Sequence, residues 1–568
     1  MDIEAWVKLG LIEKRLGRYT DAENCCRRAI AIAPRTGLAH YALGTVLQSQ
    51  GRVQEAIHAY RQARQYQPDY ADTHYWLGNA LHQSGAMRDA IASYRQAIKL
   101  KPNFPEALGD LGAALLDLGE IEQAADLLQR ALAMQPANPV INSNMSHALR
   151  LQGKVDQALD NFRRALRLTP NAIEVIAGLA GLLEKTGQLT EAEELTRHGL
   201  QLAPESAAIN LVAAQLDRRN KRLQQAADRL ETLRNQPLSM DIAGEVELTL
   251  GQLYDHMEDS QRSLPLIISG NDKKARASLQ SESQRSQYLQ RVQAMAALAT
   301  PQLAERMQQA VATNSCPADP IFLIGFPRSG TTLMEQILDS HPRLQAMEEK
   351  GAVGAMVNAF LATSQDRPEA LAELNESDIA RLRQVYFDEA GKHIDLRPDS
   401  ILVDKMPLNT VEVPVIRRVF PRAKFILAVR HPCDVSLSCL MQNFAVNAAM
   451  ANFFSLEDTV QAYVAVMKAW QKYAELLPLD YHRIRYEDLI EDVPGETRRL
   501  LDFLGIDWND AVLDHTGHAR QRATINTPSY HQVVQPVYQN AKYRWKRYEQ
   551  AFSAVLPALQ PFIEYFGY

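Results

Sequence analysis

The segment "PIFLIGFPRSGTTLMEQILDSHP", residues 320–342, decides the fold of the second half of the chain. Its apolar run IFLIG (321–325) predicts a buried parallel strand, and TTLMEQILDS (331–340) predicts the helix that follows. The turn FPRSG between them directs backbone N–H groups and a helix N-terminus towards one point, a geometry that binds phosphate and similar anions. The segment therefore predicts an α/β domain with an anion site at the end of a parallel strand.

The side chains of this turn favour an anion held without a metal. Arg328 supplies a planar, permanently charged guanidinium beside Gly330. Hydroxyl donors are added by Ser329, Thr331 and Thr332. Walker A nucleoside-triphosphate enzymes carry a lysine where this chain has Thr331. Because that lysine is missing and no aspartate for magnesium is evident, a kinase is the less favoured interpretation.

A second strand–turn–helix pattern follows in "KFILAVRHPCDVSLSCLMQNF", residues 424–444. Arg430 ends the predicted strand, and Ser438 lies eight residues later in the predicted helix. These two residues are candidates for a second phosphate site at the same edge of the sheet. Two separate anion sites indicate a nucleotide with phosphates at both ends of its ribose.

The first half of the chain repeats with a period of 34 residues. The repeat is seen in prolines at 34, 68, 102, 136, 170 and 204, in glycines at 17, 51, 85, 119, 153 and 187, and in alanines at 22, 56, 90, 124, 158 and 192. A further glycine series begins at Gly10 and Gly44. This period and its small-residue pattern resemble the tetratricopeptide repeat (TPR), a helix–turn–helix unit. One such pair cannot bury its own apolar face, so stacking into a solenoid is expected.

The repeat gives the domain organisation. We expect an all-α TPR solenoid over residues 3–236, whose last pair is degenerate. A helical cap and linker over 237–317 and an α/β, P-loop-like domain with a parallel sheet over 318–568 follow. Solenoids of this kind bind a peptide or protein in their groove, and a role as a dimerisation or spacing element is the alternative. A homo-oligomer is compatible with either role.

Composition narrows the function classes. The chain has 568 residues and a formal net charge of −6, which gives no basic field for general nucleic-acid binding. Its five cysteines (25, 26, 316, 433 and 439) form no CxxC pair, which fits a reducing cytoplasm. No apolar run reaches the ~18 residues of a membrane span, and the N-terminus does not look like a signal peptide. The sequence predicts a cytoplasmic protein without a nucleic-acid or membrane partner.

Together, "PRSGTT" and "VRHPCDVSLS" closely resemble the 5′-phosphosulfate and 3′-phosphate motifs of sulfotransferases that use 3′-phosphoadenosine 5′-phosphosulfate (PAPS). The resemblance covers about residues 318–568. "LDSHP" (338–342) and the Glu-Glu pair at 348–349 are most similar to tyrosylprotein sulfotransferases. The resemblance implies PAPS as donor, 3′-phosphoadenosine 5′-phosphate (PAP) as product, and no metal.

The resemblance also implies the catalytic residues. Glu349 matches the base that deprotonates the acceptor hydroxyl, with Glu348 as an orienting neighbour. Lys405 matches a lysine that neutralises charge on the departing nucleotide, and Arg328 holds the sulfonate in line. A solvated carboxylate and an exposed strand-end lysine are the structural alternatives. His341 is the alternative base, since cytosolic small-molecule sulfotransferases use a histidine, but it is expected instead to close its helix before Pro342.

Further cofactor residues follow from the same resemblance. Tyr486 in "RIRYEDL" matches a tyrosine at the nucleotide, and simple core packing is its alternative role. "SYHQVVQPVYQNAKYRW" (529–545) resembles the segment that covers the cofactor, including Ser529 and Arg544. The chain departs from the family at Gln442 and Gly351, where arginines are found in other members.

The sequence thus predicts in-line sulfuryl transfer from PAPS to a hydroxyl, with tyrosine of a protein or peptide recruited by the solenoid as the favoured acceptor. A glycan, lipid or small-molecule acceptor is the enzymatic alternative. A TPR scaffold with an inert, nucleotide-binding transferase domain is the non-enzymatic alternative.

Overall fold

The computed structural model describes residues 2–568 except 119, 278–280, 311–318, 365–366, 368, 445–446, 515–516 and 518–541. The chain divides into two compact units, Met1–Gln236 and Pro237–Tyr568. The helical stretch after Gln236 therefore groups with the α/β part and not with the repeats. Each unit has its own core.

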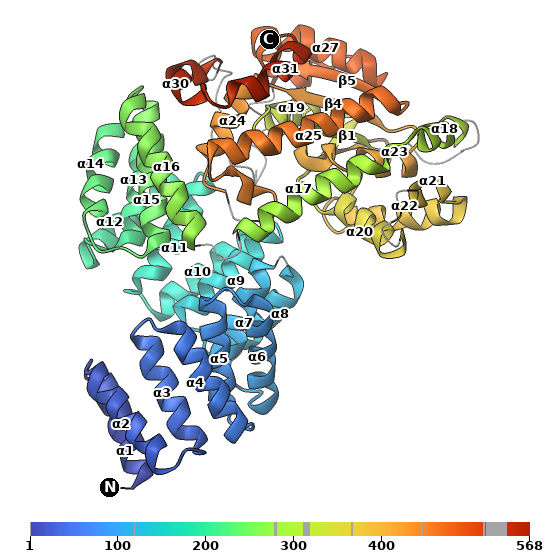
Figure 1. The fold of residues 1–568 in the computed structure, drawn as a ribbon. Coiled ribbons are helices and arrows are strands. Elements are labelled where there is room, and N and C mark those ends of the chain that lie inside the picture. Colours follow the sequence, from blue (N-terminus) through green and yellow to red (C-terminus); the bar gives the residue numbers. More distant parts are fainter. Residues whose placement is uncertain are drawn as a thin grey trace. The chain divides into compact units, whose positions relative to one another are not determined.

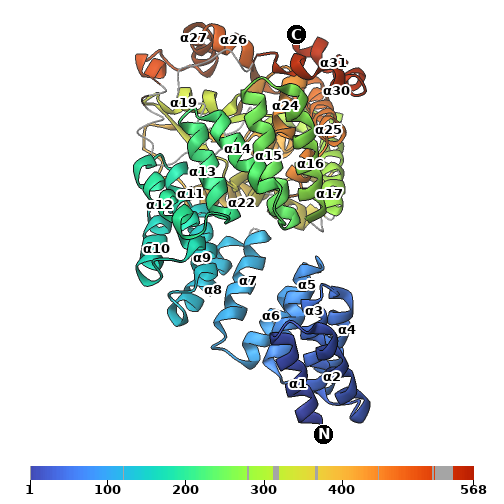
Figure 2. The same ribbon diagram turned by 90° about the vertical axis from the view of Figure 1, so that its left-hand side faces the viewer.

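The first unit is a succession of helix–turn–helix pairs (Figures 1 and 2). Each odd-numbered helix packs on the even-numbered helix that follows it. The bounds are α1 Ile3–Arg15, α2 Tyr19–Ile32, α3 Gly37–Ser49, α4 Val53–Tyr66, α5 Ala71–Gln83, α6 Met87–Leu100, α7 Pro105–Asp117, α8 Ile121–Met134, α9 Pro139–Leu151, α10 Val155–Leu168, α11 Ile173–Lys185, α12 Leu189–Leu202, α13 Ala207–Arg219 and α14 Leu223–Arg234. The predicted solenoid is confirmed.

The periodic glycines have the expected roles. Gly44 lets its helix approach the next one, because a Cβ there would lie 2.6 Å from the Tyr60 ring. Gly51 adopts φ +77° in the turn between α3 and α4, a left-handed conformation that is cheap for glycine. The same two features recur in several of the other pairs, with close approach at Gly10, Gly78 and Gly112 and positive φ at Gly17, Gly85, Gly153 and Gly187.

The second unit begins with helices that precede the sheet. Their bounds are α15 Met240–His256, α16 Ser260–Ala277, α17 Ser281–Leu298 and α18 Pro301–Ala310. α15 and α16 form a tight hairpin, in which a Cβ on Gly251 would lie 2.6 Å from Ile267. Leu248 and Ile267 of this hairpin belong to the large apolar core of the α/β part, which explains why these helices group with it.

The sheet contains the parallel strands β2-β3-β1-β4-β5 in that spatial order. Their bounds are β1 Ile321–Gly325, β2 Leu344–Glu348, β3 Ile401–Lys405, β4 Lys424–Val429 and β5 Asp480–Arg485. The prediction of an α/β domain with a parallel sheet is confirmed. Strand β2 was not predicted, because its short stretch LQAME lacks a continuous apolar run.

Helices cover both faces of the sheet (Figure 1). One face packs on α19 Thr331–Asp339, α26 Tyr486–Glu491 and α27 Val493–Leu504. The other packs on α17, α20 Ala352–Ser364, α22 Glu376–Ala390, α23 Val413–Val419, α24 Pro432–Leu440, α25 Leu456–Leu476 and α31 Leu556–Phe566. This burial of both faces explains why β1 and β4 are almost wholly apolar.

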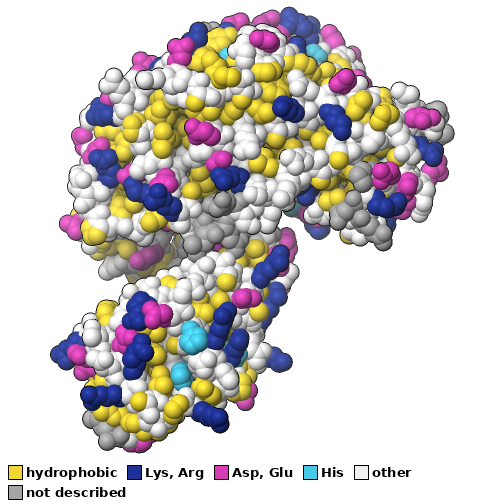
Figure 3. All heavy atoms as spheres, viewed as in Figure 1, with side chains coloured by type: hydrophobic (Ala, Val, Ile, Leu, Met, Phe, Trp, Pro, Cys, Tyr) yellow, Lys and Arg dark blue, Asp and Glu magenta, His cyan; other side chains and the backbone are white. Residues whose placement is uncertain are grey.

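The distribution of charge on the surface agrees with the composition. Basic and acidic side chains are intermingled on the face shown in Figure 3. Among the described helices, none has both the length and the apolar character needed to cross a membrane.

Candidate functional site

The candidate residues lie at the carboxyl edge of the sheet, the side on which open α/β sheets bind ligands. The anion-binding turn follows β1, and Glu349 follows β2. Lys405 is the last residue of β3, and Arg430 and Tyr486 come directly after β4 and β5. Residues separated by up to 158 positions (486 − 328) are thereby brought to one edge.

The turn after β1 is held in a conformation that few residues adopt. Arg328 has φ +71° and Gly330 has φ +93°. Gly330 is also the N-cap of α19, so the first N–H groups of that helix, which have no carbonyl partner within the helix, point out of the turn. A Cβ on Gly330 would lie 2.6 Å from the Tyr486 ring. Ser329, Thr331 and Thr332 are buried around this turn.

The two predicted phosphate motifs meet through Arg328. Its Nε donates a hydrogen bond to Ser438 Oγ on α24 at 3.1 Å. Arg430 Nη1 in turn donates to the Arg328 carbonyl at 3.4 Å, and the Arg430 guanidinium lies 5.0 Å from the centre of the Tyr486 ring. Two permanent positive charges, a hydroxyl and a helix N-terminus are thus concentrated in one place, which favours a polyanion.

Lys405 and three glutamates form the second part of the site. The Lys405 ammonium is fully buried and lies 2.8 Å from Glu349 Oε1, 3.0 Å from Glu335 Oε2 and 4.0 Å from Glu348 Oε1. Burial lowers the pKa of Lys405, but the charges of Glu335, Glu349 and Glu348 outweigh burial and raise this pKa above its ordinary value. Lys405 is therefore a charged donor inside the protein, in contrast to the exposed lysine that was the alternative.

Glu349 is held at the edge of this cluster by its backbone. Its φ is +45°, a strained value for a residue with a side chain and one that is often found at functional sites. Its N–H donates to the Lys405 carbonyl at 2.8 Å, which extends the pairing of β2 with β3 by one residue. The Glu349 side chain is 39% exposed, so it is accessible to a substrate while its neighbour Glu348 is buried.

α24 is braced from the C-terminal segment. Asp434, which is buried on α24, accepts hydrogen bonds from the backbone N–H groups of Tyr543 and Trp545 at 2.7 and 2.8 Å. His431 at the N-cap stacks on the Trp545 ring. Burial, aided by the nearby positive charge of Arg430, lowers the pKa of His431 to about 4, so it stays neutral. This packing fixes the helix that carries Ser438.

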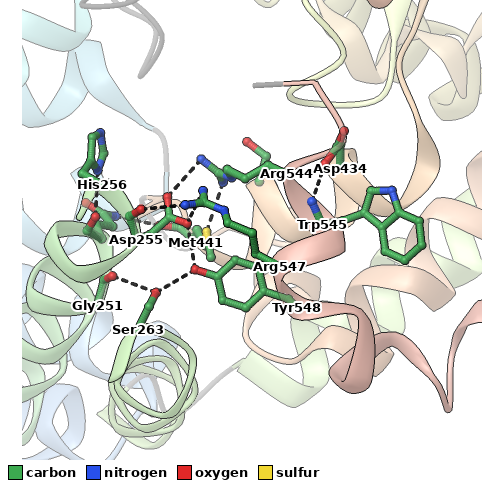
Figure 4. A network of polar contacts seen from close by, with 12 residues as sticks. Gly251, Asp255, His256, Ser263, Asp434, Met441, Arg544, Trp545, Arg547 and Tyr548 are labelled. Atoms are coloured by element: carbon green, nitrogen blue, oxygen red, sulfur yellow. Dashed lines mark hydrogen bonds and ion pairs between the residues drawn. The ribbon is translucent and has the colours of Figure 1, made fainter. Parts of the chain in front are cut away.

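Arg544, predicted to contact the cofactor, contacts α15 and the residue after α24. It forms an ion pair with Asp255 of α15 at 3.3 Å and contacts Met441 Sδ at 3.0 Å (Figure 4). Asp255 is buried and also binds Arg547 at 3.0 Å and the Tyr548 hydroxyl at 2.7 Å. Sequence reasoning missed Asp255, because no motif links α15 to the end of the chain.

The remaining candidates are His341, Ser529 and a metal site. His341 is buried, with Nε2 3.0 Å from the Asp507 carbonyl and Nδ1 accepting the Arg343 N–H at 3.2 Å, so its ring is committed to structure. Ser529 lies outside the described residues. Within the part of the chain that is described, no cluster of three or more His, Cys, Asp or Glu side chains has the arrangement of a metal site.

With this geometry established, comparison with known proteins identifies the second unit. Residues 320–510 match the model of the "Sulfotransferase family". The second unit carries a sulfotransferase-family domain. Tetratricopeptide-repeat models match residues 2–68, 41–103, 81–145 and 149–200 of the first unit.

Relatives of known sequence match parts of this chain at low identity. An uncharacterized protein of Aquifex aeolicus is 29% identical over 343 residues, 58% of this chain and 43% of that protein. Protein-tyrosine sulfotransferase 2 of Gallus gallus is 27% identical over 243 residues, 40% of this chain and 62% of that protein. A TPR protein of Parabacteroides merdae with a crystal structure aligns at a TM-score of 0.39 and 16% identity, over 44% of this chain and 98% of that chain. The chain thus spans less than two thirds of the two sequence relatives.

Proposed function

We propose that the sulfotransferase-family domain transfers a sulfuryl group from PAPS to a hydroxyl, most favourably to tyrosine in a protein held by the TPR unit. The observation that carries this proposal is the contact between Arg328 and Ser438, which joins two anion-binding motifs beside the Glu349–Lys405 pair. A nucleotide with phosphates on both sides of its ribose fits such a double site better than a singly phosphorylated one.

The donor fits the residues that are present. The N-terminus of α19 and the turn at Ser329–Thr332 would hold the 5′-phosphosulfate, with Arg328 as counter-charge. Arg430 and Ser438 would hold the 3′-phosphate. Gly330 lets this turn pack directly on Tyr486, since a Cβ there would lie 2.6 Å from the Tyr486 ring. Ser529 and Arg544 stay predictions as further nucleotide contacts.

Glu349, Lys405 and Arg328 then have different roles in the proposed reaction. When bound, PAPS supplies a sulfuryl group on an activated mixed anhydride, so no metal is needed to activate it. Glu349 accepts the proton of the acceptor hydroxyl, because its side chain is accessible and is a carboxylate paired with Lys405. Lys405 stabilises the negative charge that develops where the sulfuryl group departs. Arg328 and the turn hold the sulfonate in line.

Tyrosine is the favoured acceptor for two reasons. The relatives with 25–28% identity include protein-tyrosine sulfotransferases from several animals, and TPR solenoids commonly bind polypeptides. Gly351 leaves open space near the base, since a Cβ there would meet no atom within 4 Å. A bulky phenol attached to a peptide is compatible with that space, as is a glycan.

The test is transfer of labelled sulfate. The full chain is incubated with ³⁵S-labelled PAPS and an acidic peptide containing one tyrosine, and with the same peptide carrying phenylalanine as the matched control. Label on the tyrosine peptide alone is the expected result, and Glu349→Gln should reduce it at least ~100-fold.

Each other outcome contradicts a defined part of the proposal. Equal labelling of both peptides excludes tyrosine as the acceptor. PAP binding without transfer to any peptide, glycan or phenol would favour the inert scaffold. Unchanged transfer by Glu349→Gln would exclude that residue as the base.

A further inference from the structure

Glu335 is a buried carboxylate that the proposed reaction does not use. It lies on α19, five positions after Gly330, and none of its surface is exposed. Its Oε2 is 3.0 Å from the Lys405 ammonium, whose surface is also fully buried. A fully buried carboxylate is tolerated only when a partner compensates for its lost hydration, and Lys405 is placed to do so.

The carboxylates around Lys405 have unequal access to a substrate. Glu349 is 39% exposed, whereas the side chains of Glu348 and Glu335 are 7% and 0% exposed. Glu335 also lies within helix α19, while Glu349 directly follows the end of β2. Only Glu349 of these three is therefore suited to meet an acceptor hydroxyl, and Glu335 is suited to stay where it is.

The proposed base cannot serve as a permanent counter-ion. Once Glu349 has accepted a proton, its carboxyl group is neutral and no longer balances Lys405. Without Glu335, the only described carboxylate left beside the buried ammonium would be Glu348, at 4.0 Å, in addition to the charge of the bound nucleotide. Asp404, the preceding residue on β3, offers no direct pairing, because it points to the other face of the sheet and accepts a hydrogen bond from Tyr386 at 2.9 Å.

Resting on the proposed function, we propose that Glu335 is a positioning residue that keeps Lys405 charged and in place while Glu349 exchanges its proton. Glu335 thereby frees Glu349 from the ion pair at the moment the acceptor binds. The influences on the pKa of Lys405 agree with this role. Burial has the largest influence and lowers this pKa, and the charge of Glu335 has the next largest influence and raises it. Arg328 and Arg430 complete the site from the neighbouring turns.

The first test does not require turnover. The full chain is labelled with [ε-¹³C]lysine, and the Lys405 resonance is identified by its loss in Lys405→Met. The wild-type Lys405 resonance should show no titration up to about pH 11, whereas in Glu335→Gln titration should begin at least about 1 pH unit earlier than in the wild type. Glu348→Gln, which removes a carboxylate farther away, should shift this onset less. Glu335→Asp keeps the charge and should restore most of the shift. An unchanged onset of Lys405 titration in Glu335→Gln overturns the proposal, whether or not the protein transfers sulfate.

A second test distinguishes a positioning role of Glu335 from a purely structural role. With an active acceptor, Glu335→Gln should lower kcat at least ~10-fold and move the alkaline limb of its pH profile to lower pH, with the KM for PAPS changed less than ~2-fold. A uniform loss at every pH, together with weaker PAP binding, would indicate a structural role and contradict the proposal. Absence of transfer in the wild-type protein contradicts the proposed function instead, while the lysine titration still decides the role of Glu335.

Discussion

Replacing Gly330 by alanine tests how the turn after β1 supports the site. Alanine at φ +93° costs about 1–2 kcal/mol for the left-handed backbone. Its Cβ would also lie 2.6 Å from Tyr486 Cδ2, and relieving such overpacking costs about 1–3 kcal/mol. Gly330→Ala should therefore lower the local unfolding free energy by about 2–5 kcal/mol and weaken PAP binding at least ~10-fold.

The assay is the urea dependence of hydrogen exchange in peptides that cover β1 and α19, which assigns the change to the second unit. Gly351→Ala is the matched control, because its Cβ meets no atom within 4 Å, and it should change the free energy by less than ~0.5 kcal/mol. In a Tyr486→Ala background the clash disappears, so Gly330→Ala should then cost only the backbone part. Equal costs in both backgrounds, or no cost at all, would refute the reasoning.

Two further predictions concern buried charges. Burial raises the pKa of Asp404 from 3.8 to about 7, so the ionisation of Asp404 disfavours folding increasingly as pH rises from about 4 to 7. Asp404→Asn should therefore stabilise the protein by up to ~4 kcal/mol at pH 8 and by almost nothing at pH 4. A difference in unfolding free energy that does not depend on pH would contradict this prediction. Asp255→Ala leaves the cations of Arg544 and Arg547 without their shared partner, so exchange protection of residues 542–552 should fall by ~3 kcal/mol. Asp272→Ala, which breaks an exposed pair on α16, is the control and should cost under ~1 kcal/mol.

The repeats and most of the sheet could be predicted because their patterns are local. Proline and glycine at fixed intervals determine where each repeat helix ends, and the apolar runs at 321–325 and 424–429 are long enough to indicate buried strands. The short strand β2 could not be predicted this way, since Gln345 interrupts its apolar residues. Its position matters because it brings Glu349 beside Lys405.

The unpredicted features of the site depend on contacts between distant residues. In the sequence, Glu335 has the pattern of an ordinary polar position in an amphipathic helix. Its role could not be predicted, because only the pairing of β1 with β3 brings α19 next to Lys405. Asp255 and Arg544 are 289 positions apart (544 − 255) and meet only after the hairpin of α15 and α16 has packed. The motifs indicated which residues are candidates for binding an anion, and only the tertiary structure shows which charged residues lie beside them.

Calorimetric titration of PAP into the full chain tests the central claim most directly. The account predicts one binding site, weakened at least ~10-fold by Arg328→Ala and by Ser438→Ala, and unaffected by Arg381→Ala on the exposed surface of α22. Absence of binding heat at several temperatures, or binding that neither Arg328→Ala nor Ser438→Ala weakens, would contradict a nucleotide gripped at both of its phosphates.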